Sequence, residues 1–226
     1  MSINESARRR GLVEGLVADV PDFPRPGVVF KDITPLLASP QGFQAAITEL
    51  VTTAPRDIDV VVGMEARGFI FAAPVALALG AGFVPVRKPG KLPGETISES
   101  FELEYGFETL TMHRDAIRRG ARVLVVDDVL ATGGTVGATA ALLKQMGADL
   151  VHVSVLIELG FLGGRERLAT MGIDNFARFA APGVVMLTWT DDRDDPQWEI
   201  SNEALRILEA TVDAHGRPLR VIRLHQ

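Results

Sequence analysis

The chain has 226 residues, of which 47% are hydrophobic and 23% are charged, so it can bury a substantial core and is not a disordered or fibrous protein. Its formal net charge is −6, and such an acidic chain lacks the surplus of Lys and Arg that nucleic-acid binding requires. It contains no cysteine, which excludes disulfide frameworks, thiolate zinc sites, iron–sulfur clusters and cysteine nucleophiles.

Apolar periodicity divides most of the chain into alternating helices and strands. In chain order these are a helix over residues 5–19, a Pro-rich break over 21–27, a helix over 41–53, a strand over 58–62, a helix over 67–79, a strand over 83–87, a strand over 123–126, a helix over 134–146 and a strand over 150–157. Strands that are apolar on both faces and alternate with helices predict a parallel sheet with helices on both sides.

Between the strands over 83–87 and 123–126, the pattern changes twice. A polar segment rich in Gly and Pro predicts a mobile loop over 88–98. Residues 100–105 and 107–113 then alternate in polarity, which predicts a β-hairpin. Glu102 and Glu104 share one face of this hairpin, and their spacing alone does not distinguish a functional carboxylate from a solvated edge residue.

Beyond residue 172 the alternation of strands and helices ends. An Asp-rich segment over 191–195 reads as a solvated turn. A helix is predicted over 197–213 and a last strand over 218–224.

Residues 68–86 carry no charge, and their number alone would suit a transmembrane helix. Two prolines and two glycines interrupt this run, so we interpret it as a buried helix followed by a buried strand. The Arg-containing N-terminal segment has acidic residues within its apolar run, unlike a secretory signal. We therefore expect a soluble, cytoplasmic protein with no membrane partner.

The most informative segment runs from Val123 to Thr135. Four aliphatic residues form a buried strand, and Asp127 and Asp128 follow it, at the edge of an α/β sheet where ligands bind. Residues 131–135 then form a Gly-rich turn that opens a helix, and its backbone N–H groups can hold a phosphate. A plain strand–helix turn with capping aspartates is the alternative. The combination predicts a site for a phosphorylated sugar.

Basic side chains gather near the same sheet edge. Arg67 follows a strand and opens a helix, and Arg87, Lys88 and Lys91 surround the start of the polar loop. Guanidinium and ammonium groups bind phosphate oxygens, so local positive charge in an acidic protein favours an anionic ligand. Helix capping by Arg67 and a solvated basic patch are the alternatives.

The segment over 123–135 resembles the signature of type I phosphoribosyltransferases that binds 5-phosphoribosyl 1-pyrophosphate (PRPP), and the wider chain resembles the members that act on adenine. The supporting stretches, in the family's order, are residues 21–35, 63–69, 87–93, 103–106 and 164–168. The resemblance implies an α/β type I phosphoribosyltransferase fold: a twisted, mainly parallel sheet flanked by helices, with a small hood and a flexible loop. It implies a catalytic domain over 1–190, with the hood from 20–36 and the flexible loop over 92–110. Residues 191–226 are then an extension of unknown role.

The same resemblance implies a reaction: transfer of the 5-phosphoribosyl group of PRPP to adenine, giving AMP and pyrophosphate in purine salvage. Its implied catalytic residues are Glu104, Asp127 and Asp128. PRPP would be bound by Arg67, Arg87, Lys88, Lys91, Ala131, Thr132, Gly133, Gly134 and Thr135. Adenine would be bound by Val29, Phe30 and Lys31. The implied cofactor is Mg²⁺, with no direct protein ligand, because PRPP and water would hold it.

Two other functions remain open on the sequence. The first is a phosphoribosyltransferase for xanthine, guanine or hypoxanthine, because the hydrogen bonds of the base pocket decide between purines. The second is a PRPP-sensing regulator that binds nucleic acid, which would need a basic face or an added helix-turn-helix. The net charge of −6 and the short N-terminal segment argue against this function. The family resemblance also implies a homodimer in which Arg87 reaches the site of a partner subunit, with no nucleic-acid partner.

Overall fold

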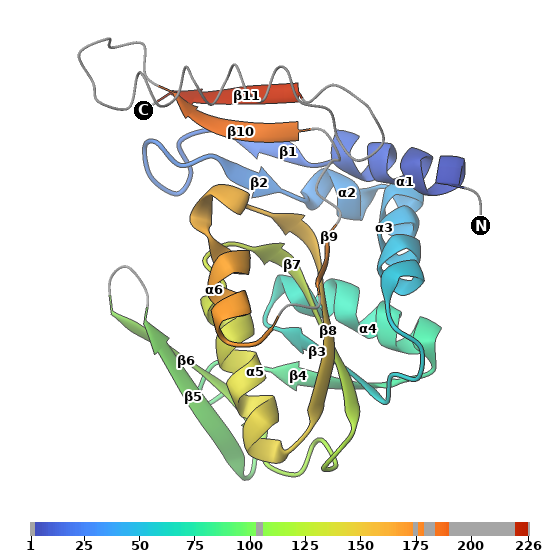
Figure 1. Ribbon diagram of the computed structural model, residues 1–226, viewed down its shortest axis with the longest axis vertical. Helices are drawn as coiled ribbons and strands as arrows, with labels where there is room; N and C mark the ends of the chain where they lie inside the picture. The colour runs from blue at the N-terminus through green and yellow to red at the C-terminus, as the bar shows by residue number, and fades with distance from the viewer. Residues whose placement is uncertain (1–2, 103–105, 174–175, 179–183, 190–219, 226) are drawn as a thin grey trace. The chain divides into compact units, whose positions relative to one another are not determined.

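The computed structural model describes most of the chain up to residue 173 and three strands beyond it (Figure 1). The described residues are 3–102, 106–173, 176–178, 184–189 and 220–225. They form two compact units: the first comprises residues 1–9 and 43–179, and the second comprises residues 10–42 and 180–226.

The first unit is built on a five-stranded sheet, and every neighbouring pair of its strands is parallel. In spatial order the strands are β4 (Gly82–Val86), β3 (Val60–Met64), β7 (Arg122–Leu130), β8 (Asp149–Glu158) and β9 (Phe176–Arg178). The predicted α/β fold with a parallel sheet is therefore confirmed. The short, continuous apolar runs at β3 and β7 are buried because helices cover both faces of a parallel sheet.

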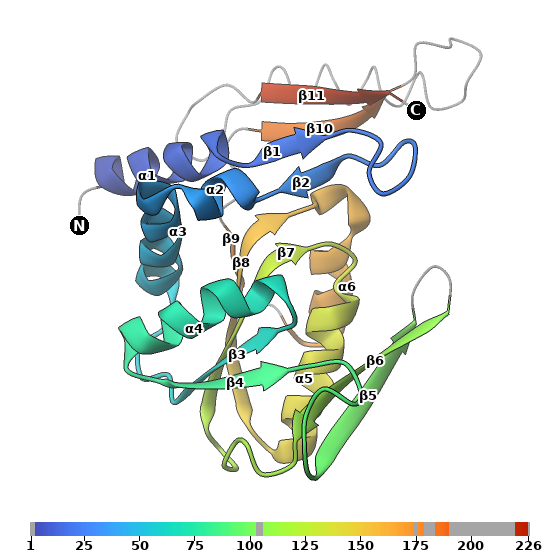
Figure 2. The same cartoon turned by 180° about the vertical axis from the view of Figure 1, so that it is seen from behind.

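The helices of this unit include α3 (Pro40–Thr53, which begins in the second unit), α4 (Arg67–Leu79), α5 (Gly134–Met146), the 3₁₀ turn η1 (Gly160–Leu162) and α6 (Gly164–Thr170). Figures 1 and 2 show α5 and α4 on opposite faces of the sheet. Valines of β3, β7 and β8 belong to one hydrophobic core with Val136 and Leu142 of α5. Among the described residues no helix is long and apolar enough to span a membrane, and α4, which begins at Arg67 and continues into the uncharged run, has 13 residues.

A separate two-stranded antiparallel ribbon contains β5 (Thr96–Glu102) and β6 (Phe107–His113). The predicted hairpin is confirmed, but the predicted loop over 88–98 is wrong at its end, because Thr96 already pairs with His113. The ribbon packs on α5, where Gln145 donates a 2.8 Å hydrogen bond to Glu99. Residues 103–105, which include Glu104, lie outside the described residues.

The second unit contains shorter elements. They are α1 (Ile3–Gly15, which begins in the first unit), β1 (Ala18–Val20), β2 (Phe30–Asp32), α2 (Thr34–Ala38), β10 (Val184–Trp189) and β11 (Arg220–His225). The predicted helix over 5–19 is too long, because Ala18 already pairs with Asp32 of β2. The predicted last strand is confirmed as β11, which pairs with β10 in parallel. The predicted helix over 197–213 lies outside the described residues, and the domain boundary at 190 stays a prediction.

Candidate active site

Two adjacent carboxylates lie in the last part of β7. The strand is longer than predicted, because it pairs with β8 as far as Leu130 but with β3 only as far as Val126. Asp127 and Asp128 therefore lie beyond the part of β7 that pairs with β3, although β8 still supports the strand there. Their residues are only 8% and 6% exposed. Both carboxylates lie at this edge of the sheet as predicted, but the predicted strand over 123–126 ends too early.

Burial controls the charge of this pair. Burial raises the pKa of Asp127 well above its ordinary value, and the negative charge of Asp128 raises it further. Burial also raises the pKa of Asp128, although the positive charge of Arg67 partly opposes this change. The backbone N–H of Asp128 donates a 2.9 Å hydrogen bond to Oδ1 of Asp127. The free protein thus holds two carboxylates that are costly to ionise together and that favour a positively charged or hydroxyl-bearing ligand.

The start of α4 is packed directly on this carboxylate pair. Arg67 is the first residue of α4, and its Nε lies 2.7 Å from Oδ2 of Asp128. A Cβ at Gly68 would lie only 2.6 Å from Oδ1 of Asp127, so a glycine is needed for this approach. The turn before α4 contains a cis peptide bond between Glu65 and Ala66. The fold therefore brings together Arg67, Asp127 and Asp128, which lie far apart in the sequence.

Two of the other predicted cations, Arg87 and Lys88, also contact carboxylates. Nε of Arg87 lies 2.8 Å from Oε2 of Glu65, and Nη1 of Arg87 donates a 3.1 Å hydrogen bond to the carbonyl of Lys91. Lys88 forms an ion pair with Glu108 of β6. The hydrogen bond with Glu108 raises the pKa of Lys88, so this ammonium group stays charged.

Glu65 and Glu108 were not singled out from the sequence. The signal for Glu65 was present, since β3 and β4 are parallel and Met64 lies opposite Val86, which makes Glu65 and Arg87 neighbours. Burial raises the pKa of Glu65, but the bonds and charges of Arg87 and Lys88 outweigh this effect and bring it below its ordinary value. No pattern along the chain pairs Lys88 with Glu108, because that contact depends on where the ribbon lies.

The Gly-rich turn over 131–135 leads from β7 into α5. Gly133 caps the helix in the left-handed conformation, with φ of 78°, and Gly134 and Thr135 form its first turn. The free N–H groups at a helix start, together with the helix dipole, favour an anion at this position. The turn lies at the carboxyl end of the same strand as Asp127 and Asp128. Its role as a phosphate site stays a prediction.

The predicted adenine residues Val29, Phe30 and Lys31 belong to the second unit. The ring of Phe30 packs edge to face with Phe23, with 5.1 Å between ring centres. Lys31 lies opposite Asp19 on the neighbouring strand and forms an ion pair with it. All three residues are partly exposed, so their contact with a base stays a prediction.

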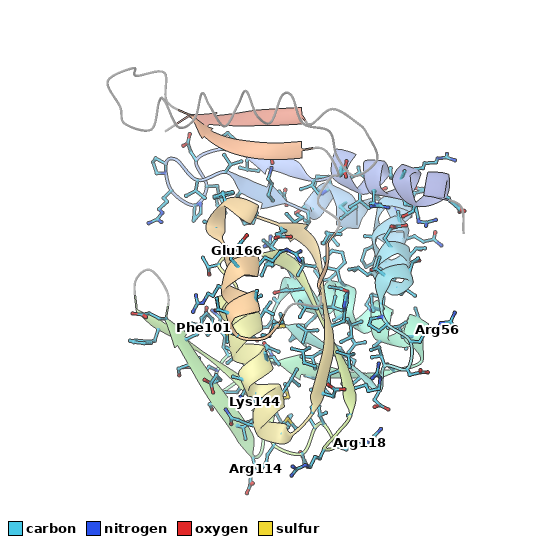
Figure 3. All side chains as sticks on the ribbon, viewed as in Figure 1. Arg56, Phe101, Arg114, Arg118, Lys144 and Glu166 are labelled. Carbon is cyan, nitrogen blue, oxygen red and sulfur yellow. The ribbon has the colours of Figure 1, made fainter. Side chains whose placement is uncertain are left out.

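Two cavities border the α5 region. One of about 270 Å³ lies between β5 and the start of α5, and Phe101, Gly133 and Arg167 are among its lining residues. Phe101 is labelled on β5 in Figure 3, and a Cβ at Gly134 would lie 2.6 Å from its ring. A cavity of about 420 Å³ lies beside the other end of α5 and contains none of the predicted site residues. Within the described part of the chain, no group of three or more acidic or histidine side chains could hold a metal ion.

Comparisons with known proteins agree with this geometry. The family model of the phosphoribosyl transferase domain matches residues 31–169. An adenine phosphoribosyltransferase from Cutibacterium acnes is 70% identical over 73% of this chain and 93% of its own length. The crystal structure of adenine phosphoribosyltransferase from Thermoanaerobacter pseudethanolicus is 45% identical, with a TM-score of 0.72, over 75% of this chain and 98% of that one.

A third comparison adds bound ligands. The Saccharomyces cerevisiae adenine phosphoribosyltransferase, crystallised with an imino-altritol bisphosphate and adenine, is 37% identical, with a TM-score of 0.70, over 77% of this chain and 99% of that one. A model of the Porphyromonas-type peptidyl-arginine deiminase family matches residues 138–226, which is less than half of the chain and overlaps α5, β8 and α6. The phosphoribosyl transferase model spans more than half of the chain and extends from before β3 to the last turn of α6. The chain therefore belongs to the type I phosphoribosyltransferase family, among the adenine phosphoribosyltransferases.

Proposed function

We propose that this chain transfers the 5-phosphoribosyl group of PRPP to adenine, giving AMP and pyrophosphate in purine salvage. One observation supports this most strongly: a buried pair of carboxylates, Asp127 and Asp128, lies directly before a Gly-rich helix start and beside Arg67. This arrangement places at one sheet edge carboxylates that suit a sugar, a helix start that suits a phosphate and an arginine that suits a diphosphate. The relatives named above carry the adenine activity in their names, and the yeast protein was crystallised with adenine.

Asp127 and Asp128 act on the ribose. Their oxygens accept hydrogen bonds from the 2′ and 3′ hydroxyl groups and orient the sugar ring. As the bond from C1 to pyrophosphate breaks, positive charge develops on the ring, and two carboxylates in a low-dielectric site stabilise that charge. Their burial makes this effect stronger than it would be in water, and it also explains why their ionisation is costly in the free protein.

The turn before α5 holds the 5′-phosphate. Its residues are Ala131, Thr132, Gly133, Gly134 and Thr135. Backbone N–H groups at the start of α5 donate to phosphate oxygens, and the threonine hydroxyls add further donors. Anchoring the phosphate at this point fixes the distance between C1 of the ribose and the carboxylates of β7.

Arg67, Arg87, Lys88 and Lys91 bind the pyrophosphate. In the free protein the carboxylates of Asp128, Glu65 and Glu108 hold three of these cations near the site. A diphosphate carries more negative charge than one carboxylate, so PRPP can displace these partners. Each of these three cations therefore already lies near the proposed pyrophosphate position when PRPP binds.

Mg²⁺ suits this site, because the oxygens of PRPP and the nearby carboxylates are the hard ligands that it prefers. The family resemblance implies that PRPP oxygens and water would hold the ion, with no direct protein ligand, because Mg²⁺ usually keeps several waters. When bound, it supplies positive charge that neutralises the departing pyrophosphate.

Adenine binds to Val29, Phe30 and Lys31, with Phe30 against the face of the purine and backbone groups of its neighbours at the purine edge. Glu104 exchanges a proton with a nitrogen of the base. The predicted flexible loop over 92–110 closes over the site and excludes water, which would otherwise hydrolyse the reactive C1. These assignments rest on the family resemblance.

The functional form is a homodimer formed through α4 and β4. β4 is an edge strand of the sheet, and Phe83 on it is exposed, as are Ile70 and Leu77 on α4. Leu77 is 83% exposed, and together with Ile70 and Phe83 it gives α4 and β4 an apolar surface of the kind that a second subunit covers. Arg87 follows β4 directly, so a partner docked here would place it near both sites.

One experiment tests the reaction directly. Pyrophosphate release from PRPP is measured with adenine, guanine, hypoxanthine and xanthine offered separately in the presence of Mg²⁺. Release with adenine alone is expected, because a pocket built from hydrogen bonds rejects purines with other exocyclic groups. Release with another base and none with adenine would replace the assignment by one of the alternative phosphoribosyltransferases.

A further inference from the structure

The first residue of α6, Gly164, touches the turn before α5 with its backbone. A Cβ at Gly164 would overlap the carbonyl oxygen of Ala131 and would lie 3.1 Å from the backbone nitrogen of Gly133. A Cβ at Gly133 would in turn lie 2.9 Å from the carbonyl oxygen of Gly164. The two backbone segments therefore touch with no side chain between them. Because both are closely packed, neither segment can shift to make room for a side chain at Gly164 or Gly133.

The next turn of α6 continues this contact. Leu168 is completely buried, and its Cγ lies 3.1 Å from the position that a Cβ of Gly133 would occupy. Its Cδ2 lies 3.6 Å from the equivalent position at Gly137, one turn further along α5. α6 therefore supports both the turn and the first residues of the helix that follows.

An ion pair fixes the direction of α6. Arg165 donates two hydrogen bonds to the carboxylate of Glu158, of 2.9 and 2.7 Å, and the side chain of Glu158 is only 4% exposed. Glu158 is the last residue of β8 and lies opposite Leu130, the last residue of β7. These hydrogen bonds raise the pKa of Arg165, which agrees with a tight two-point contact. The end of the sheet is thus connected through Glu158 and Arg165 to the helix that supports the turn.

We propose that α6 positions the phosphate-binding turn, with Gly164 setting the distance between them and the Glu158–Arg165 ion pair setting the orientation of the helix. Gly164 and Arg165 act through residues 131–135 and are positioning residues rather than ligands of the substrate. The proposal rests on the proposed function, because the turn must hold the 5′-phosphate for its position to matter. It explains why the stretch over 164–168, which contributes no ligand to the proposed site, packs against it.

The test compares two ligands that use different parts of the site. Ribose 5-phosphate reports on the turn, and pyrophosphate reports on the cations around Arg67. In Gly164→Ala, ribose 5-phosphate should bind about tenfold more weakly or worse by titration calorimetry, as for the loss of one hydrogen bond to a charged group. The affinity of Gly164→Ala for pyrophosphate should equal that of the unaltered chain. The matched control is Gly160→Ala, because a Cβ at Gly160 would have no atom within 4 Å.

If Gly164→Ala does not fold, a second series of variants at Arg165 tests the same proposal. Arg165→Lys keeps the charge but loses the two-point contact, and Arg165→Met loses both. The KM for PRPP should rise in the order of the unaltered chain, Arg165→Lys and Arg165→Met, while the KM for adenine stays constant. Unchanged ribose 5-phosphate binding in Gly164→Ala, or equal losses of both ligands, would overturn the positioning role. If the unaltered chain itself neither binds ribose 5-phosphate nor releases pyrophosphate with adenine, the proposed function fails instead.

Discussion

Nε of Arg67 lies 2.7 Å from Oδ2 of Asp128, so a cation proposed for the diphosphate contacts a carboxylate proposed for the ribose. Asp128 is almost completely buried, whereas the side chain of Arg67 is 37% exposed. Burial makes the charge of Asp128 costly and Arg67 partly offsets that cost, while the exposed side of Arg67 is open to a ligand. When PRPP binds, Arg67 has a stronger anion to contact, and Asp128 becomes available to the sugar.

Arg67→Ala should raise the KM for PRPP by about tenfold or more, the cost of one charge-assisted hydrogen bond, and leave the KM for adenine unchanged. Initial rates at varied PRPP and adenine concentrations measure both constants. Arg56→Ala is the matched control, since Arg56 is an exposed arginine just before β3 (Figure 3). An unchanged KM for PRPP would remove Arg67 from the site.

Asp127→Asn should lower kcat by about 10² to 10³, the usual cost of losing one charge-stabilising group, with a much smaller effect on PRPP binding. The amide oxygen can still accept the N–H of Asp128, so the local structure is kept. Steady-state kinetics with Asp115→Asn, at an exposed aspartate, as the control measures this effect. A kcat equal to that of the unaltered chain would rule out charge stabilisation by Asp127.

Asp127→Asn should also be more stable than the unaltered chain, by an amount that grows with pH. Burial, and then the charge of Asp128, raises the folded-state pKa of Asp127 above its ordinary value of 3.8, so the folded state binds this proton more tightly than the unfolded state. Stability from this group is present below the ordinary pKa and is lost as the pH rises toward the folded-state pKa. Urea unfolding of both chains between about pH 4 and pH 8 measures the difference. A difference that shrinks with rising pH would contradict the raised pKa.

Glu108→Gln should lower the KM for PRPP by about twofold to fivefold, because Glu108 competes with the diphosphate for Lys88. The effect is small because a partly exposed ion pair contributes little free energy. The control is Glu95→Gln, which removes an exposed ion pair with Arg114 just before the same ribbon. A higher KM in Glu108→Gln alone would instead mean that Glu108 holds Lys88 in its binding position.

Leu77→Glu should convert the homodimer to monomers, because it places a charge in the proposed apolar interface of α4 and β4. Phe107→Glu is the control, since Phe107 is 78% exposed but lies on the β5–β6 ribbon. Sedimentation velocity distinguishes the two states. A dimer that survives Leu77→Glu and dissociates in Phe107→Glu would move the interface to the ribbon.

Local patterns along the chain predicted the class of sheet and the two helices that border the candidate site, although the helix over 5–19 was too long and α2 and α6 were not predicted. The predicted helices over 67–79 and 134–146 match α4 and α5 at both ends. Hydrophobic periodicity and Gly positions are short-range signals, and they mark where a helix starts and where its cap must adopt a left-handed conformation. The carboxylates, the Gly-rich turn and Arg67 could be proposed as a site for the same reason, since each lies where a predicted strand leads into the next predicted helix.

Contacts between segments that lie far apart in the sequence could not be predicted from local patterns. β7 extends through Asp127 and Asp128 because β8 continues to pair with it, and no local pattern shows how far a neighbouring strand reaches. Glu108 meets Lys88 only because the ribbon returns beside β4, where Arg87 and Thr111 form a bridge.

The role of Gly164 likewise could not be predicted from local sequence patterns. Nothing in the sequence near residue 164 indicates that its backbone must touch residues 131–133, more than thirty positions earlier. The amino-acid pattern specifies which chemical groups are available and which strand each one follows. Strand register and close backbone packing specify which of them meet, because contacts of this kind depend on distances across the whole sheet rather than along the chain.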